Sequence, residues 1–165
     1  MTTIKTEIRD KGVYVITLNR PKVLNSLNKE IIDELLEAFE VAYDDQKIRT
    51  VVLTGEGRGF CSGADLAGGG WPSDPSWSPG ESTAHAMEIG FNPLVRKIVN
   101  CPKPVVNAIN GIAAGGGVGL VGSEMCIRDR YKPDPIAPHL EKLSKLIPMI
   151  LPELHLYPHL IGPCH

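Results

Sequence analysis

The chain has 165 residues, which is enough for one domain built around one hydrophobic core. Its 17 basic and 19 acidic residues give a formal net charge of −2, which argues against a general nucleic-acid binder because such proteins carry a surplus of basic residues. No run of about 18 apolar residues is present, and residues 2–10 lack the apolar stretch of a secretory signal. We therefore expect a cytoplasmic protein with neither a nucleic-acid nor a membrane partner.

The cysteines do not predict a metal site. They are widely scattered and show no paired C-x-x-C spacing, which a structural zinc site would need. We expect no metal and a reduced, intracellular setting. The four positions are Cys61, Cys101, Cys126 and Cys164.

The first predicted elements are a β-hairpin and a helix. Residues 4–10 alternate between apolar and polar side chains, and residues 13–18 (VYVITL) form a more apolar strand after a short turn. A helix with apolar residues at helical spacing follows, capped by Ser26 or Asn28 and ending near residue 44.

The next strand is predicted at the centre of a sheet. Residues 49–54 (RTVVLT) are continuously apolar, which is typical of a strand covered on both faces. Residues 67–81 are rich in glycine and proline and predict a loop. Trp71 and Trp77 in this loop are either anchors that pack on the core or parts of a flap that closes over a ligand.

The rest of the pattern continues the alternation of helix and strand. Residues 82–100 predict a helix that is capped by Ser82 or Thr83 and kinked or split by Pro93. Residues 105–109 (VVNAI) predict a buried strand, and residues 110–120 predict a strand end, a glycine turn and the start of a helix. The order β-β-α-β-α-β indicates an α/β fold with mostly parallel strands.

Two loops of small residues follow apolar strands, residues 62–65 (SGAD) and 115–117 (GGG). Small residues let a ligand approach the backbone, and a helix start offers unpaired N–H groups. If the loops lie side by side, two N–H groups converge on one oxygen and form an oxyanion hole. The alternative for the glycines is close packing of a strand on a helix. A dinucleotide fingerprint fails because Leu120 and Phe60 occupy positions that need glycine, and no Lys-Ser/Thr pair supports a P-loop.

A rival interpretation makes Cys61 the nucleophile of a hydrolase, because Gly59-x-Cys61-x-Gly63 has the spacing of a nucleophile elbow. An elbow needs a strand that runs directly into it and a helix directly after it. Here glycines precede the cysteine and a long loop follows, so a small buried residue is the expected role of Cys61.

Three stretches carry a resemblance to a known family: ITLNRPKVLNSLN, VVLTGEGRGFCSGADL and NPLVRKIVNCPKPVVNAINGIAAGGG. In this order and spacing they resemble the crotonase superfamily, the enoyl-CoA hydratase/isomerase family. The resemblance covers about residues 4–120 and implies that residues 1–120 are the N-terminal part of a crotonase-like domain, a truncated spiral of β-β-α repeats. Within the family, the third stretch is most similar to the isomerases that act on the ring-epoxide of phenylacetyl-CoA.

The resemblance implies a site for an acyl-CoA thioester, with coenzyme A as part of the substrate and no separate cofactor. The thioester oxygen would lie between the backbone N–H groups of Ala64 and Gly116, which stabilise the enolate formed when the neighbouring carbon loses a proton. Two segments would contact coenzyme A. They contribute Ser62, Asp65 and Leu66, and Lys22, Val23 and Leu24. Lys22 either meets a phosphate or is an ordinary surface lysine.

The sequence departs from the family pattern at two places. Gly119 stands where hydratases carry a catalytic glutamate, so isomerisation is favoured over hydration, and no general base is identified. Residues 121–165 do not resemble the family and are similar to a translated assembly artefact. We therefore expect weak or no activity from this chain; a non-catalytic acyl-CoA binder and a misassembled gene fragment remain alternatives. The family's homotrimers or hexamers are not extended to it.

Overall fold

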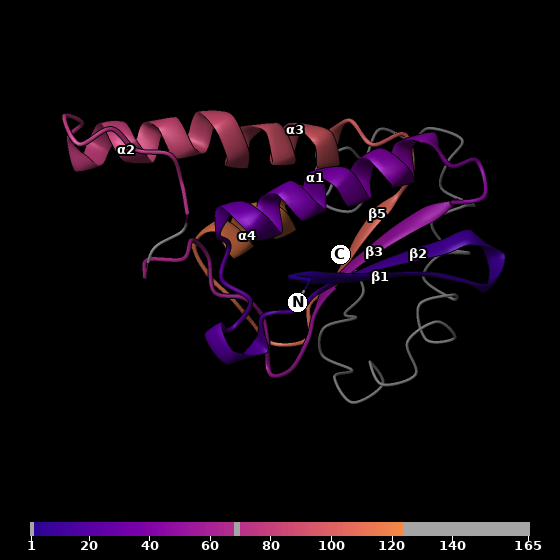
Figure 1. Ribbon diagram of the computed structural model, residues 1–165. Coiled ribbons are helices and arrows are strands. Elements are labelled where there is room, and N and C mark those ends of the chain that lie inside the picture. Colours follow the sequence, from indigo (N-terminus) through magenta and orange to yellow (C-terminus); the bar gives the residue numbers. More distant parts are fainter. Residues whose placement is uncertain (1, 68–69, 124–165) are drawn as a thin grey trace, which may run out of the picture. The chain divides into compact units, whose positions relative to one another are not determined.

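Three consecutive β-β-α units make up the part of the chain that the computed structural model describes, residues 2–67 and 70–123 (Figure 1). The first contains β1 (Ile4–Arg9), β2 (Val13–Leu18) and α1 (Lys29–Asp44). The second contains β3 (Thr50–Gly55), β4 (Gly59–Cys61) and a helical segment with α2 (Pro79–Ala86) and α3 (Asn92–Val99). The third contains β5 (Val105–Ala108), β6 (Ile112–Ala113) and α4 (Gly116–Gly122).

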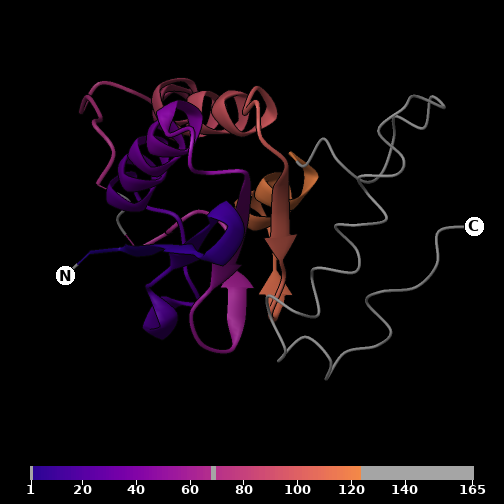
Figure 2. The same cartoon turned by 90° about the vertical axis from the view of Figure 1, so that its right-hand side faces the viewer.

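The strands form two sheets. Four strands pair in the order β1-β2-β3-β5, and β4 pairs with β6 in a second sheet. β1 and β2 are antiparallel, with Ile4 opposite Leu18, as the hairpin prediction required. All other pairs are parallel, and Figure 2 shows the magenta β4 beside the orange β6. The predicted α/β fold with mostly parallel strands is confirmed, and β3 lies between two strands as expected.

The hydrophobic core lies between the four-stranded sheet and the helices on one of its faces (Figure 1). α1 buries Ile31, Leu35 and Phe39 there, at the spacing that places side chains on one face of a helix. Side chains alternate along a strand, so Ile16 and Leu18 of β2 point into the same core. α1 is thereby fixed against the sheet, and the loop that precedes it is held in place.

The helix cap at Asn28 is one of the two that the sequence predicted. The Asn28 side chain accepts a hydrogen bond from the Ile31 N–H at 3.0 Å and satisfies one of the first-turn donors. Ser26, the other candidate, instead accepts from Arg20 through its backbone oxygen and its hydroxyl.

The predicted start of the second helix is wrong. The helix begins at Pro79 rather than beyond Ser82, because Ser78 and Glu81 form a capping box and proline is well suited to the first helical position. Pro93 interrupts the segment as predicted. A π-helical turn, Met87–Phe91, separates α2 from α3. Such turns occur where the regular i→i−4 hydrogen bonding of a helix is disturbed.

Among residues 2–67 and 70–123, no helix combines the length and apolar character needed to cross a lipid bilayer. The segment predicted to depart from the family, residues 121–165, lies outside the described residues from position 124 onward. The boundary at residue 120 stays a prediction.

Candidate functional site

The two loops of small residues lie in contact. Gly63 has φ +98°, a conformation that favours glycine, and a Cβ placed on it would lie 2.9 Å from the Ala114 oxygen and 3.1 Å from the Gly116 nitrogen. Any side chain at position 63 would therefore push the loops apart. The juxtaposition that the sequence argument required is present.

Ala64 and Gly116 occupy equivalent places in two successive units. β4 and β6 pair Cys61 with Ala113, and each amide follows its paired residue by three positions. A Cβ built on Gly116 would lie 3.8 Å from the Ala64 nitrogen. The two backbone segments thus lie close to each other at these two amides.

Neither of these two N–H groups donates to an acceptor among the described residues. Their neighbours are engaged: the Asp65 N–H donates to the Leu27 oxygen at 2.9 Å, and the Gly117 N–H donates to the Ala114 oxygen at 2.8 Å. Ala64 is exposed and Gly116 half-buried. Two neighbouring N–H groups without an acceptor in the described residues have the chemistry of an anion-binding site.

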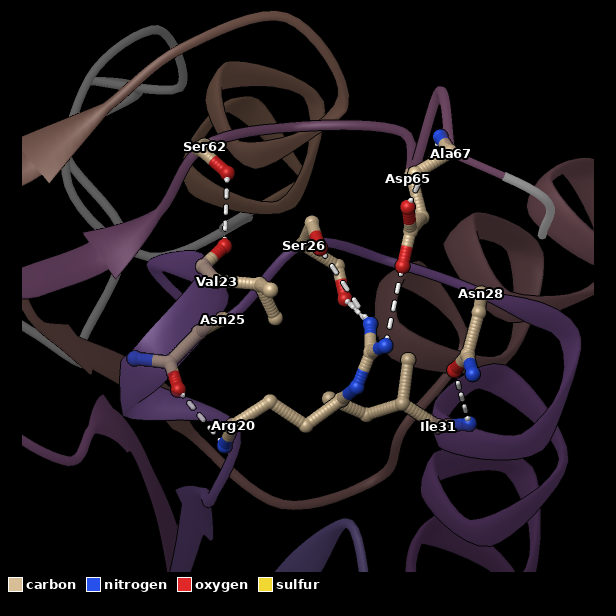
Figure 3. Close-up of polar contacts among 9 residues, drawn as sticks. All are labelled: Arg20, Val23, Asn25, Ser26, Asn28, Ile31, Ser62, Asp65 and Ala67. Carbon is tan, nitrogen blue, oxygen red and sulfur yellow. Dashed lines mark hydrogen bonds and ion pairs between the residues drawn. The ribbon is translucent and has the colours of Figure 1, made fainter.

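An ion pair holds the first loop (Figure 3). The Arg20 Nη2 group donates to the Asp65 carboxylate at 2.9 Å, and the two side chains are 21% and 12% exposed. The hydrogen bond from Arg20 holds the pKa of the Asp65 carboxyl below its ordinary value. The Asp65 carboxylate is therefore ionised and engaged inside the protein, and its predicted contact with coenzyme A stays a prediction.

Asn25 fastens the chain between β2 and α1 to the start of β4. It is fully buried; its Oδ1 accepts the Arg20 N–H at 2.8 Å and its Nδ2 donates to the Gly59 oxygen at 2.8 Å. Leu24 and Asn25 both adopt left-handed backbone conformations, with φ +50° and +55°. Such conformations are uncommon for residues other than glycine, and asparagine adopts them more readily than leucine. Strain of this kind persists only where the surroundings fix the conformation.

The two segments predicted to contact coenzyme A lie side by side. The Ser62 N–H donates to the Leu24 oxygen at 3.0 Å, and the Ser62 hydroxyl donates to the Val23 oxygen at 3.3 Å (Figure 3). Lys22 is exposed in the 3₁₀ turn Pro21–Val23, and Leu66 is 96% exposed. These side chains are accessible to a ligand, and their contacts with one stay predictions.

An aromatic ring, that of Phe91, lies next to Gly116, and the Trp71 ring packs on it. The Phe91 Cε1 atom lies 3.5 Å from the position of a Gly116 Cβ, and the Trp71 and Phe91 ring centroids are 5.4 Å apart. Trp71 packs against the core from the loop, as the anchor interpretation predicted. The same prediction is wrong for Trp77, which is 36% exposed. The flap interpretation stays a prediction.

The sequence argument did not identify Arg20 and Asn25. One signal was available: an aspartate in a loop of tiny residues needs a cationic partner if it is to be withdrawn from water, and Arg20 lies at the end of a buried strand.

Cys61 does not have the surroundings of a nucleophile. It is fully buried, and burial raises the pKa of its thiol, although a hydrogen bond from the Gly63 backbone opposes this in part. His85, the histidine within the described residues, packs on the Trp77 ring at 4.8 Å between centroids. The hydrolase interpretation therefore lacks an activated thiol.

A groove of about 410 Å³ runs along the start of α1. Its lining contains one basic side chain, Lys29, and four acidic ones: Glu30, Asp33, Glu34 and Glu37. Carboxylates repel the phosphates of coenzyme A. We therefore place the candidate site at the two loops rather than in this groove.

Comparisons with known proteins show which family the chain resembles. A family model described as enoyl-CoA hydratase/isomerase matches residues 8–126. The 1,2-epoxyphenylacetyl-CoA isomerase of Escherichia coli is 43% identical over 122 residues, and a probable enoyl-CoA hydratase of Rhodobacter capsulatus is 42% identical over 118 residues. These matches cover 73% and 72% of this chain but only 45% and 42% of the relatives, so the chain spans less than half of their length. A crystal structure of an enoyl-CoA hydratase from Bacillus anthracis superposes with a TM-score of 0.66 and 31% identity, over 74% of this chain and 45% of that one.

Proposed function

Because the chain belongs to the enoyl-CoA hydratase/isomerase family and its β-β-α units have the crotonase fold, we propose that it binds an acyl-CoA thioester and stabilises the enolate with the N–H groups of Ala64 and Gly116. The observation that carries the proposal is the contact of the two loops at Gly63, next to two N–H groups without an acceptor in residues 2–67 and 70–123.

The chemistry follows from where charge develops. When the carbon next to the thioester loses a proton, the negative charge moves onto the thioester oxygen. A fixed N–H donor aimed at such an oxygen is typically worth about 3–4 kcal/mol of transition-state stabilisation. The segments around Ser62 and Lys22 would hold the coenzyme A end of the substrate, so no cofactor beyond the substrate itself is needed.

Isomerisation fits the chain better than hydration. Hydration needs a side chain that transfers a proton to or from water. Gly119 has none, and a Cβ built there would meet nothing within 4 Å. The Escherichia coli relative, named as an isomerase of an epoxidised phenylacetyl thioester, supports an isomerase of similar substrates. The family's trimeric or hexameric assembly stays a prediction.

The same glycine favours the second candidate, a non-catalytic acyl-CoA binder. Calorimetry with a saturated acyl-CoA, combined with NMR of the exchange of its α-protons in heavy water, separates the two. An enzyme exchanges these protons, whereas a binder gives heat without exchange.

The oxyanion hole is tested with acetoacetyl-CoA, whose α-proton lies between two carbonyl groups and leaves easily. We expect the ligand bound to the full chain to enolise at lower pH than the free ligand, with at least about tenfold more enolate at a given pH, or about 1.4 kcal/mol. Ultraviolet absorbance of the enolate as a function of pH measures this. Binding with an unchanged ligand pKa would overturn the proposal.

A matched pair of variants separates the N–H group from the shape of the loop. Gly116→Pro removes the donor, and proline suits the first position of a helix, which Gly116 occupies in α4. Gly116→Ala keeps the donor, and its Cβ meets the flexible Leu27 side chain at 3.3 Å. We expect the proline variant alone to lose the extra enolate.

A further inference from the structure

We propose that Arg20 is a positioning residue that fixes the Ala64 N–H group in the geometry needed for enolate stabilisation. The inference rests on the proposed function and adds a residue outside the two loops that form the candidate hole. Arg20 does not need to touch the substrate. It acts through Asp65, which follows Ala64 in the chain, and through Ser26, which precedes Leu27.

The Arg20 side chain binds two segments at once (Figure 3). Its Nη1 group donates to the Ser26 oxygen at 2.5 Å and to the Ser26 hydroxyl at 3.2 Å, while Nη2 donates to the Asp65 carboxylate at 2.9 Å. The planar guanidinium therefore sets the distance between position 26 and position 65.

Ala64 is held between these two contacts. The Leu27 N–H donates to the Gly63 oxygen at 2.7 Å, and the Asp65 N–H donates to the Leu27 oxygen at 2.9 Å. These bonds form a parallel bridge between Leu27 and Ala64 that leaves the Ala64 N–H free. The bridge is one residue long, so the Arg20 contacts on both of its flanks determine the direction of that N–H group.

The Arg20 backbone orders the second predicted coenzyme A segment. Its oxygen accepts the Val23 N–H at 3.1 Å and the Asn25 N–H at 3.0 Å, and its own N–H donates to the Asn25 side chain. One residue thus connects the turn carrying Lys22 to the loop carrying Ala64.

The charge of the pair matters because both side chains are mostly withdrawn from water, at 21% and 12% exposure. Removing one partner leaves the other as an uncompensated, partly buried charge, which the loop relieves by moving toward solvent. Lysine carries the charge but cannot make the two-pronged contact, so it restores the pair only in part.

The test compares Arg20→Met, Arg20→Lys and Asp65→Asn with the wild type and with Arg96→Met, a variant of an exposed arginine on α3. Each full chain is saturated with acetoacetyl-CoA, and the fraction of bound ligand that is enolate is measured against pH. Melting temperatures and the Kd of free CoA are measured in parallel. At saturation the enolate fraction reports the geometry of the hole rather than the amount of folded or occupied protein.

We expect Arg20→Met and Asp65→Asn to remove most of the roughly tenfold increase in the enolisation constant of the bound ligand, because a displaced N–H group no longer donates to the enolate oxygen. Arg20→Lys should fall between them and the wild type, and Arg96→Met should match the wild type. Asp65→Asn keeps the pair testable if Arg20→Met does not fold.

The outcomes are distinct. Normal enolisation in the wild type and in both pair variants, with only a lower melting temperature, would show a purely structural role and overturn the inference while leaving the proposed function intact. No enolisation in the wild type would overturn the proposed function and the inference together.

Discussion

The guanidinium of Arg20 donates to the carboxylate of Asp65 at 2.9 Å and joins two loops whose positions are 45 residues apart in the chain. Neither loop belongs to the four-stranded sheet, so strand pairing within that sheet does not set the distance between them. The ion pair adds to the hydrogen bonds that Leu27 makes with the second loop and that Asn25 makes with the start of β4. It acts at the point where β2 leads toward α1 and β4 leads into the Ala64 loop. Acid should remove it.

The first prediction concerns acid stability. Because the hydrogen bond from Arg20 lowers the pKa of the folded Asp65 carboxyl, the unfolded chain, with an Asp pKa of about 3.9, binds the proton more readily. The stabilisation is therefore fully present above about pH 4 and is lost as the pH falls through the folded pKa. We expect Asp65→Asn to lower the free energy of unfolding by about 2 kcal/mol at pH 7, with the difference shrinking under acid.

Urea unfolding of both chains between pH 2.5 and pH 7 measures this difference. Asp33→Asn is the control, since Asp33 forms an exposed pair with Lys29 one helical turn away and should cost no more than about 0.5 kcal/mol. A difference between wild type and Asp65→Asn that stays constant with pH would contradict the prediction.

The second prediction concerns the contact of the two loops. Gly63→Ala adds a Cβ 2.9 Å from the Ala114 oxygen and strains a backbone with φ +98°, so the loops must separate. Gly70→Ala imposes a similar backbone strain at φ +66° but meets nothing within 4 Å. We expect the Gly70 variant to lose about 1–2 kcal/mol of stability and the Gly63 variant to lose more, together with enolate stabilisation. Equal losses of stability, or an unchanged enolate fraction in Gly63→Ala, would show that the contact is unimportant.

Sequence patterns predicted the elements that local chemistry determines. β2 runs from Val13 to Leu18 as expected, because a run of alternating and β-branched residues favours a strand wherever it lies. β4 was missed because it is three residues long and exists only through pairing with β6, far along the chain. The start of α2 was misplaced because Pro79 and Gly80 resemble a loop until the Ser78–Glu81 capping box is recognised.

The residues of the candidate site likewise fall into those that the sequence predicted and those that it did not. Small residues after apolar strands pointed to the two loops, and the resemblance to the family pointed to Ala64 and Gly116 within them. Arg20 and Asn25 were not identified, because their partners Asp65 and Gly59 lie 45 and 34 residues away. A polar residue beside a turn is ordinarily on the surface, and only the folded chain shows that Asn25 is buried.

The third prediction concerns the end of α1. The Lys103 ammonium donates to the Asp45 oxygen at 2.7 Å and also to the backbone oxygens of Ala42 and Tyr43. A cation here satisfies carbonyl groups that have no partner within the helix and interacts favourably with the helix dipole. We expect Lys103→Met to lower the free energy of unfolding by about 1–2 kcal/mol in urea titrations, and Lys47→Met, at an exposed position, to change it little. Similar effects of the two variants would contradict this capping role.

The fourth prediction concerns the Trp71 and Phe91 rings, which pack on each other, with Phe91 next to Gly116. A Cβ at Gly90 would lie 2.2 Å from Trp71 Cη2, so Gly90→Ala must displace the indole ring. In a Trp77→Phe background, where Trp71 is the sole tryptophan, we expect its fluorescence to shift to longer wavelength as the ring meets water. Under the proposed function, the affinity for an aryl-acyl-CoA should fall more than that for CoA, since the Phe91 ring next to Gly116 loses its partner.

Helix propensity alone predicts that Gly90→Ala stabilises the protein and leaves the Trp71 ring in place. Alanine is favoured over glycine in a helix by about 1 kcal/mol, and Gly90 lies in a π-helical turn without a positive φ. Gly80→Ala in α2 is the matched control, because its Cβ meets no atom closer than the Ser78 hydroxyl at 3.9 Å, so it should gain stability without moving the Trp71 emission. If Gly90→Ala behaves like Gly80→Ala, the Trp71 ring does not pack on Gly90, and the prediction that it supports the Phe91 ring next to Gly116 is wrong.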